Sequence, residues 1–170
     1  MRLQGLVYRA HHPGWAWAPE SGRGAELFGG RFNCKGVAAL YTSMSLQGAW
    51  SEAQQAFPFK AQPMTLCAYE VDCEDILDLR GVPELQSDLA CAWEAMALRG
   101  ETPPSWTLAD RLIAAGKAGI LVPSFAKGAE TQPGNAVFWR WGPEPPHRVR
   151  VVDDHGRLPR DALSWRDESG

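Results

Sequence analysis

The stretch GGRFNCKGVAALYTSMSLQGAWSEA, residues 29–53, joins a glycine pair to an apolar strand and an amphipathic helix. Residues 37–42 form a compact apolar run, which predicts a buried strand. Ser43 or Ser45 can cap the helix that follows, through about Phe57. The stretch therefore predicts a strand, a short turn and a helix in immediate succession.

The predicted helix has one apolar side. On a helical wheel its apolar residues share an arc of about 100°, which predicts an inward face made of Leu46, Ala49, Trp50, Ala53 and Phe57. Glu52 lies about 60° beyond the edge of this arc. A carboxylate on that flank has one side against the core and the other open to a cleft, so Glu52 is a candidate functional group.

Three further features of the stretch suit a ligand site. The Gly29-Gly30 pair lets the backbone turn sharply or approach a ligand closely, and Arg31 follows at once. Arginine makes bidentate contacts with phosphate or carboxylate. Tyr41 ends the strand, where its ring can stack on a flat base while its hydroxyl makes one hydrogen bond. With Glu52, these residues predict a site for an anionic, planar substrate that is cleaved beside a carboxylate.

Outward from this stretch, strands outnumber long helices. The hydrophobic pattern predicts strands over residues 4–9, 64–71, 76–79, 119–122, 135–141 and 148–153, and helices over 85–98 and 107–115. This order predicts an α+β fold with a mixed or antiparallel sheet flanked by helices. The segment 10–30 shows neither period. It is either a lid over the site or a surface excursion pinned by Trp15 and Trp17.

Length and composition limit the classes of protein to which the chain can belong. A chain of 170 residues with a net charge of −3 fits one domain, and it lacks the basic excess of a nucleic-acid binder. We expect a catalytic domain over 1–155 and a polar tail over 156–170. Residues 1–60 carry six basic and three acidic side chains, a balance of +3 that would attract a small anion.

The sequence also gives expectations for the location of the protein and for metal binding. The cysteines, at positions 34, 67, 73 and 91, show no metal-site spacing, and no apolar run is long enough to cross a membrane. We therefore expect a cytoplasmic protein with reduced thiols, no metal and no membrane contact.

The chain resembles the RES domain family, which is named for an Arg, a Glu and a Ser. The matching residues are Arg31 in G-R-F-N, Glu52 after L-Y-T-S, and Ser124 at the end of G-I-L-V-P-S. Asn135 then opens the next strand, and the opening Tyr8-Arg9 resembles the N-terminal strand of the family. Phe32 departs from the family, since a Trp often stands there.

The resemblance implies a fold similar to that of diphtheria-toxin-type ADP-ribosyltransferases. It also implies cleavage of the nicotinamide–ribose bond of NAD+, by hydrolysis or phosphorolysis, with NAD+ as substrate and no further cofactor. The implied role is the toxin of a bacterial type II toxin–antitoxin pair, whose antitoxin is an Xre-type DNA-binding protein that occludes the cleft. Whether the chain forms a homodimer stays open.

Roles for the candidate residues follow from the charge that develops when neutral nicotinamide leaves. We assign Glu52 to the oxocarbenium-like ribose, and Arg31 and Arg9 to the pyrophosphate. We assign Tyr41 and Tyr8 to ring stacking and to the walls of the cleft. We assign Ser124 and Asn135 to hydrogen bonds with nicotinamide, ribose or water.

Two other functions use the same residues. The first is transfer of ADP-ribose onto a macromolecule, and the second is a non-catalytic module that binds a nucleotide or a peptide. The sequence leaves open whether water, phosphate or a macromolecule accepts the ribosyl group.

Overall fold

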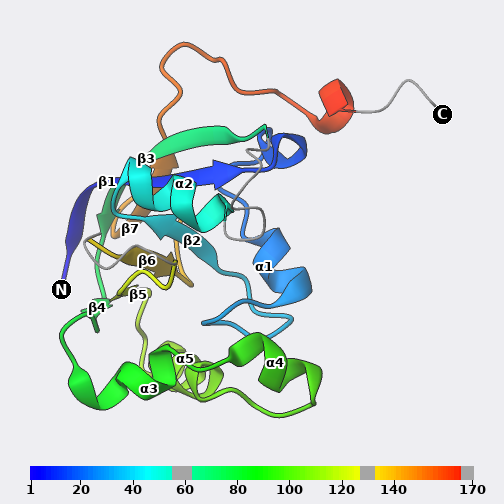
Figure 1. Ribbon diagram of the computed structural model, residues 1–170. Coiled ribbons are helices and arrows are strands. Elements are labelled where there is room, and N and C mark those ends of the chain that lie inside the picture. The colour runs from blue at the N-terminus through cyan, green and yellow to red at the C-terminus, as the bar shows by residue number, and fades with distance from the viewer. Residues whose placement is uncertain (55–62, 127–132, 166–170) are drawn as a thin grey trace.

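One seven-stranded sheet organises the chain (Figure 1). The computed structural model describes residues 1–54, 63–126 and 133–165. The strands are β1 (Leu3–His11), β2 (Leu40–Ser43), β3 (Thr65–Cys73), β4 (Ile76–Asp78), β5 (Gly119–Val122), β6 (Asn135–Phe138) and β7 (His147–Val151). They lie in the order β4-β5-β6-β2-β1-β3-β7. Only the β4–β5 pair is parallel, so the sheet is mixed, as predicted.

Helices cover both faces of the sheet and confirm the α+β class. They are α1 (Arg23–Phe28), α2 (Leu46–Gln54), α3 (Gln86–Leu89), α4 (Trp93–Leu98) and α5 (Pro104–Ala114), with single 3-10 turns η1 (Pro13–Trp15), η2 (Pro83–Leu85) and η3 (Ala162–Trp165). In Figure 1, α3, α4 and α5 lie together below β5, whereas α2 crosses near β1 and β2.

The central strands are buried on both faces. Leu121 and Phe138 belong to one hydrophobic cluster with β1 and β3. Their neighbours Ile120 and Val137 belong to a second cluster with Leu108 of α5. Because successive strand residues point to opposite faces, β5 and the last three residues of β6 must be apolar. This explains the unbroken G-I-L-V run that predicted a buried strand.

Two predicted strands have different ends in the structure. β2 begins at Leu40 rather than at residue 37, and β6 ends at Phe138 rather than at residue 141. The end of β6 has a clear cause, because the backbone N–H groups of Trp139 and Arg140 both donate to the carbonyl oxygen of Ala118. Two donors on one acceptor break the regular ladder there.

The single helix predicted over residues 85–98 is wrong. The segment forms η2, α3 and α4, with a break over residues 90–92. Nη1 of Arg31 donates to the carbonyl oxygens of Leu89 and Cys91, at 3.2 and 2.8 Å. The break therefore turns carbonyl groups toward a side chain from a distant part of the chain, which helical periodicity cannot reveal.

The prediction of a segment 10–30 without regular structure is also wrong. It contains η1 and α1, and the buried Tyr69 and the half-buried Trp141 anchor it from outside. The hydroxyl of Tyr69 donates to the carbonyl oxygen of Pro19 at 2.8 Å, and Nε1 of Trp141 donates to that of Glu20 at 2.9 Å. Trp15 and Trp17, predicted to pin the segment, are 44% and 40% exposed. A lid function for this segment stays a prediction.

A buried histidine supports the same anchor. Nε2 of His11 lies 2.5 Å from the Tyr69 hydroxyl. Because that hydroxyl already donates to Pro19, the histidine must be the donor, which fixes the Nε2–H tautomer. Burial, helped by the charge of Arg9, lowers the pKa of His11 to about 4. The imidazole is therefore neutral near pH 7.

Of the predicted inward face of helix α2, Ala49 is buried but Leu46 and Trp50 are not, so the buried face is only partly the one predicted. Ser45 caps it by accepting a hydrogen bond from the backbone N–H of Gly48 at 3.0 Å, as the sequence predicted for Ser43 or Ser45. The buried residues are Gly48 and Ala49, whereas Leu46 and Trp50 are 52% and 39% exposed. Small residues let the helix backbone approach β2 closely, so they form the contact instead of the larger apolar ones. Phe57, the last residue of the predicted face, lies outside the described residues.

A substitution at Gly48 tests this packing. Glycine weakens a helix interior by up to about 1 kcal/mol relative to alanine, so local propensity favours Gly48→Ala. An added Cβ would lie 2.8 Å from Oγ of Ser43 and 3.0 Å from Oγ of Ser45. We expect the free energy of unfolding to fall by about 1 to 3 kcal/mol, because overpacking outweighs propensity. Urea unfolding measures this change.

The matched control is Gly24→Ala in α1, where an added Cβ meets nothing within 4 Å. This control should leave the protein unchanged or slightly more stable. If Gly48→Ala proved as stable as Gly24→Ala, the close approach of α2 to β2 would be wrong.

Candidate active site

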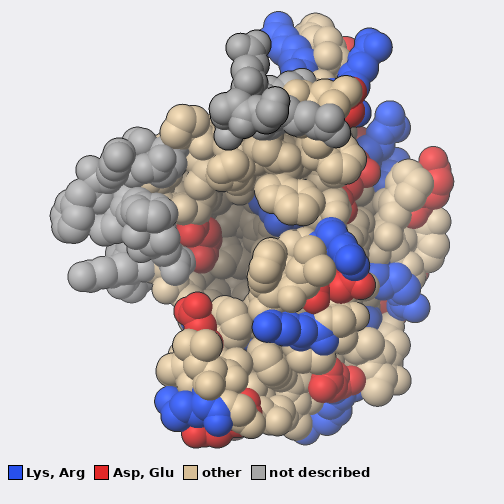
Figure 2. All heavy atoms as spheres, turned by 90° about the vertical axis from the view of Figure 1, so that its right-hand side faces the viewer, with Lys and Arg blue, Asp and Glu red and all other residues tan. Residues whose placement is uncertain are grey.

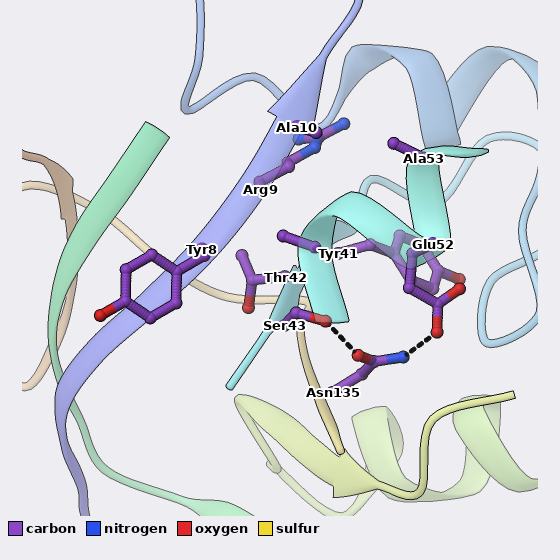
Figure 3. Close-up of a pocket in the computed structure, with 10 residues that line it drawn as sticks. Tyr8, Arg9, Ala10, Tyr41, Thr42, Ser43, Glu52, Ala53 and Asn135 are labelled. Carbon is purple, nitrogen blue, oxygen red and sulfur yellow. Dashed lines mark hydrogen bonds between the residues drawn. The ribbon is translucent and has the colours of Figure 1, made fainter. Parts of the chain in front are cut away.

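The carboxylate of Glu52 is held by two neutral donors. Oγ of Ser124 and Nδ2 of Asn135 each lie 2.7 Å from Oε1 of Glu52. Oδ1 of Asn135 in turn accepts a hydrogen bond from Oγ of Ser43 at 2.6 Å (Figure 3). A chain of hydrogen bonds from neutral side chains therefore orients the carboxylate.

Strand register brings these groups together. Asn135 opens β6, and its backbone pairs with Ser43 at the end of β2 and with Val122 at the end of β5. Ser124 follows β5 by two residues, and α2 leaves β2 after a single turn. Residues that are 72 and 83 positions from Glu52 in the sequence thus meet it at one edge of the sheet.

Two adjoining cavities flank Glu52. One has a volume of about 220 Å³ and the other about 470 Å³. Both are lined by four of the predicted site residues, namely Arg9, Tyr41, Glu52 and Asn135. Figure 2 shows a deep hollow in the face turned toward the viewer, with acidic and basic side chains on its walls. The two cavities form one cleft, with Glu52 at their junction.

Two guanidinium groups, those of Arg9 and Arg31, line the larger cavity, and neither forms an ion pair with a carboxylate in the described part of the chain. Arg31 lies 4.4 Å above the ring of Phe125, and burial lowers the pKa of both Arg31 and Arg9. Among the described residues, their only hydrogen bonds go to backbone carbonyl groups: Arg9 to Ser21 at 3.4 Å, and Arg31 to Leu89 and Cys91. Partly burying a cation without an ion pair is costly, so a bound anion would relieve that cost.

The tyrosines differ from what the sequence indicates. Tyr41 lines both cavities, but its hydroxyl donates to Oδ1 of Asn33 at 2.7 Å and accepts from the backbone N–H of Phe32 at 2.8 Å. Burial raises the pKa of Tyr41 well above its usual range. Only its ring is therefore available to a ligand. Tyr8 lines the smaller cavity, and its ring lies apart from Glu52 and Asn135 in Figure 3.

Sequence reasoning missed Asn33, which is 1% exposed. Its Nδ2 donates to the carbonyl oxygens of Ala25, Cys34 and Val37, so it ties α1 to the loop before β2. The G-R-F-N motif contained the signal, because asparagine side chains often hydrogen-bond the backbone of a turn. Phe125, under Arg31, was missed as well, and it follows Ser124 directly.

The described part of the chain also bears on metals and membranes. It contains no group of three His, Cys, Asp or Glu side chains placed to hold a metal ion. None of its helices is long and apolar enough to cross a membrane. The cytoplasmic location stays a prediction.

Fold and cleft together define an α+β protein with a hydrogen-bonded glutamate and two half-buried arginines at one edge of a mixed sheet. The RES domain family matches residues 6–161, so the chain belongs to that family. This confirms the resemblance inferred from Arg31, Glu52 and Ser124.

The structure is similar to a chain of the M. tuberculosis MbcT–MbcA toxin–antitoxin complex, with a TM-score of 0.57 and 20% sequence identity. The similarity covers 90% of this chain and 84% of that one, so the two share a fold. No curated protein matches the sequence.

Removing the Tyr41 hydroxyl tests its structural role. Tyr41→Phe leaves the N–H of Phe32 and Oδ1 of Asn33 without their partner, which we expect to lower the free energy of unfolding by about 1 to 3 kcal/mol. Tyr8→Phe is the control, since the Tyr8 hydroxyl makes no hydrogen bond to any described residue. Chemical denaturation should show a loss for Tyr41→Phe alone, and equal stabilities would contradict the assignment.

Proposed function

We propose that this chain is the toxin of a toxin–antitoxin pair and that it cleaves the nicotinamide–ribose bond of NAD+. Membership of the RES domain family supports the proposal, as does a fold shared with a chain of a toxin–antitoxin complex. The observation that carries the chemistry is the position of Glu52, which is held between two cavities that two half-buried arginines also line.

The reaction breaks the bond between C1′ of the ribose and the ring nitrogen of nicotinamide. The electron pair leaves with nicotinamide, which becomes neutral, and positive charge develops on the ribose as in glycoside hydrolysis. The Glu52 carboxylate stabilises that charge more in the transition state than in the ground state. The oxygen of water then bonds to C1′ and its proton passes to solvent; in phosphorolysis a phosphate oxygen takes this place.

Ser124 and Asn135 act in this proposal as positioning residues. Both donate to Oε1 of Glu52, so they hold the carboxylate in one orientation before substrate arrives. This differs from the roles expected from sequence, which were direct hydrogen bonds to nicotinamide, ribose or water. A preorganised carboxylate lowers the barrier because it need not reorient during the reaction.

Product analysis tests the function directly. The purified chain is incubated with NAD+ labelled in its adenosine moiety, with and without phosphate. Free ADP-ribose indicates hydrolysis, and its 1″-phosphorylated form indicates phosphorolysis. Label on protein or nucleic acid would favour ADP-ribosyl transfer instead, and binding without loss of NAD+ over hours would favour a non-catalytic module.

The partner proposed from the family is an Xre-type DNA-binding antitoxin. Co-expression of this chain with a helix-turn-helix protein encoded beside it should restore growth and yield a co-purifying complex. Growth arrest that such a protein does not relieve would contradict this part of the proposal.

The first functional prediction concerns Glu52. Glu52→Gln keeps the shape of the side chain and removes its charge, so we expect kcat for NAD+ to fall by at least about 100-fold. Glu84→Gln, on an exposed turn outside the cleft, is the matched control. A folded Glu52→Gln protein that turns over NAD+ at the wild-type rate would remove this carboxylate from the mechanism.

The second prediction separates the arginines. Arg9→Ala should raise KM for NAD+ by about tenfold or more with a small change in kcat, because a lost pyrophosphate contact weakens binding. Arg31→Ala should raise KM too, and it should also lower Tm, because its hydrogen bonds to Leu89 and Cys91 are lost. Steady-state kinetics and thermal unfolding check both. A fall in kcat at constant KM would place either arginine in transition-state stabilisation.

A further inference from the structure

A third cavity adjoins the cleft on the side away from the Glu52 helix α2. Its volume is about 460 Å³, and it shares Phe28 and Trp93 with the cavity that contains Arg31. The groove runs over residues of α1, α4 and α5. We call it the tryptophan groove, for its lining residues Trp93 and Trp106. Neither tryptophan was among the predicted site residues.

The indole of Trp106 is fixed in place by the segment that carries Arg31, and the ring of Trp93 packs against it. Nε1 of Trp106 donates to the carbonyl oxygen of Gly30 at 2.7 Å. The backbone N–H of Trp93 donates to the carbonyl oxygen of Cys91, which also accepts from Arg31. The ring centroids of Trp93 and Trp106 are 6.4 Å apart, with the planes tilted by 41°. Preformed aromatic walls of this kind bind flat ligands at low entropic cost.

The groove also exposes apolar surface that a ligand would cover. Phe28 is 72% exposed and Leu98 is 85% exposed. The charged residues that line the groove are Lys35 and Glu94. A concave apolar surface with a few polar groups is the usual form of a small-molecule site. Its continuity with the cleft favours a ligand that extends from that cleft.

We propose that the tryptophan groove binds the adenine base of the dinucleotide. This inference rests on the proposed function and extends it to the half of NAD+ that does not react. The three cavities follow one another, with Glu52 at the first junction and Arg31 in the middle cavity. A dinucleotide has a base at each end and a pyrophosphate between them, so the sequence of carboxylate, guanidinium and indole matches ribose, pyrophosphate and distal base.

The competing explanation for exposed aromatic side chains is a protein partner that covers them. The fixed indoles and the shared walls favour a base instead, because both link the groove to the cleft. A surface used only by a protein partner would not distinguish substrates that have an adenosine half from those that lack one. The experiment therefore compares a substrate that has an adenosine half with one that lacks it.

The test compares two substrates and two variants. NAD+ carries the AMP half, and nicotinamide mononucleotide lacks it but contains the same scissile bond. Trp93→Leu keeps apolar volume and removes the flat ring, and Trp93→Phe keeps a ring. Stacking of a base on an aromatic side chain predicts that Trp93→Leu raises KM for NAD+ by about 10- to 100-fold, with KM for the mononucleotide unchanged. Trp93→Phe should restore most of the affinity.

Trp17→Leu is the matched control, since Trp17 is a half-exposed tryptophan that lines none of the three cavities. It should leave the ratio of the two KM values unchanged. If Trp93→Leu raised both KM values equally, the residue would act through the shared cleft and the adenine assignment would be wrong. An unchanged KM for NAD+ would overturn it as well.

A binding measurement separates this inference from the proposed function. Isothermal titration of the wild-type chain with AMP should show binding that Trp93→Leu weakens by at least tenfold. That result would support the groove even if the chain did not cleave NAD+. If the chain cleaved NAD+ but did not bind AMP, the proposed function would stand and the groove would belong to a protein partner.

Discussion

The structure depends on keeping one carboxylate and two guanidinium groups in the same cleft without hydrogen-bonding them to one another. Among the described residues, the neutral donors Ser124 and Asn135 hydrogen-bond Glu52, whereas Arg9 and Arg31 donate to backbone carbonyl groups. A direct pair would satisfy both charges and leave nothing for a ligand. Glu52 must therefore be held by other hydrogen bonds, and these come from residues in or just after the neighbouring strands β5, β6 and β2.

The helix that carries Glu52 owes its position to the absence of side-chain bulk. Gly48 brings α2 against Ser43, and Ser43 donates to the same Asn135 that holds the carboxylate. Packing and polar positioning therefore share residues: a larger side chain at position 48 would displace both the helix and the serine. The exposed Leu46 and Trp50 show that this contact outweighs the burial of larger apolar groups.

Sequence predicted what is local and missed what depends on distant partners. Arg31, Tyr41 and Glu52 lie within one strand-turn-helix unit, so their proximity followed from residues 29–53 alone. The hydrogen bonds of Ser124 and Asn135 to Glu52 were not predicted, since strand register creates them. The inward face of α2 was partly wrong because a helical wheel counts apolar residues but ignores how closely a glycine lets the backbone approach. The broken helix over 85–98 was missed because its cause, Arg31, lies 58 and 60 residues away from its acceptors.

Arg31 links the central cavity of the cleft to the tryptophan groove. Its Nη1 fixes the turn between α3 and α4, and its guanidinium also lies over Phe125 in the central cavity. Because the carbonyl oxygen of Cys91 accepts from both Arg31 and the backbone of Trp93, a movement of the guanidinium toward an anion would be felt at the tryptophan groove. One side chain thus couples the charge in the cleft to the position of the aromatic wall, so the contribution of Arg31 to binding cannot be purely electrostatic.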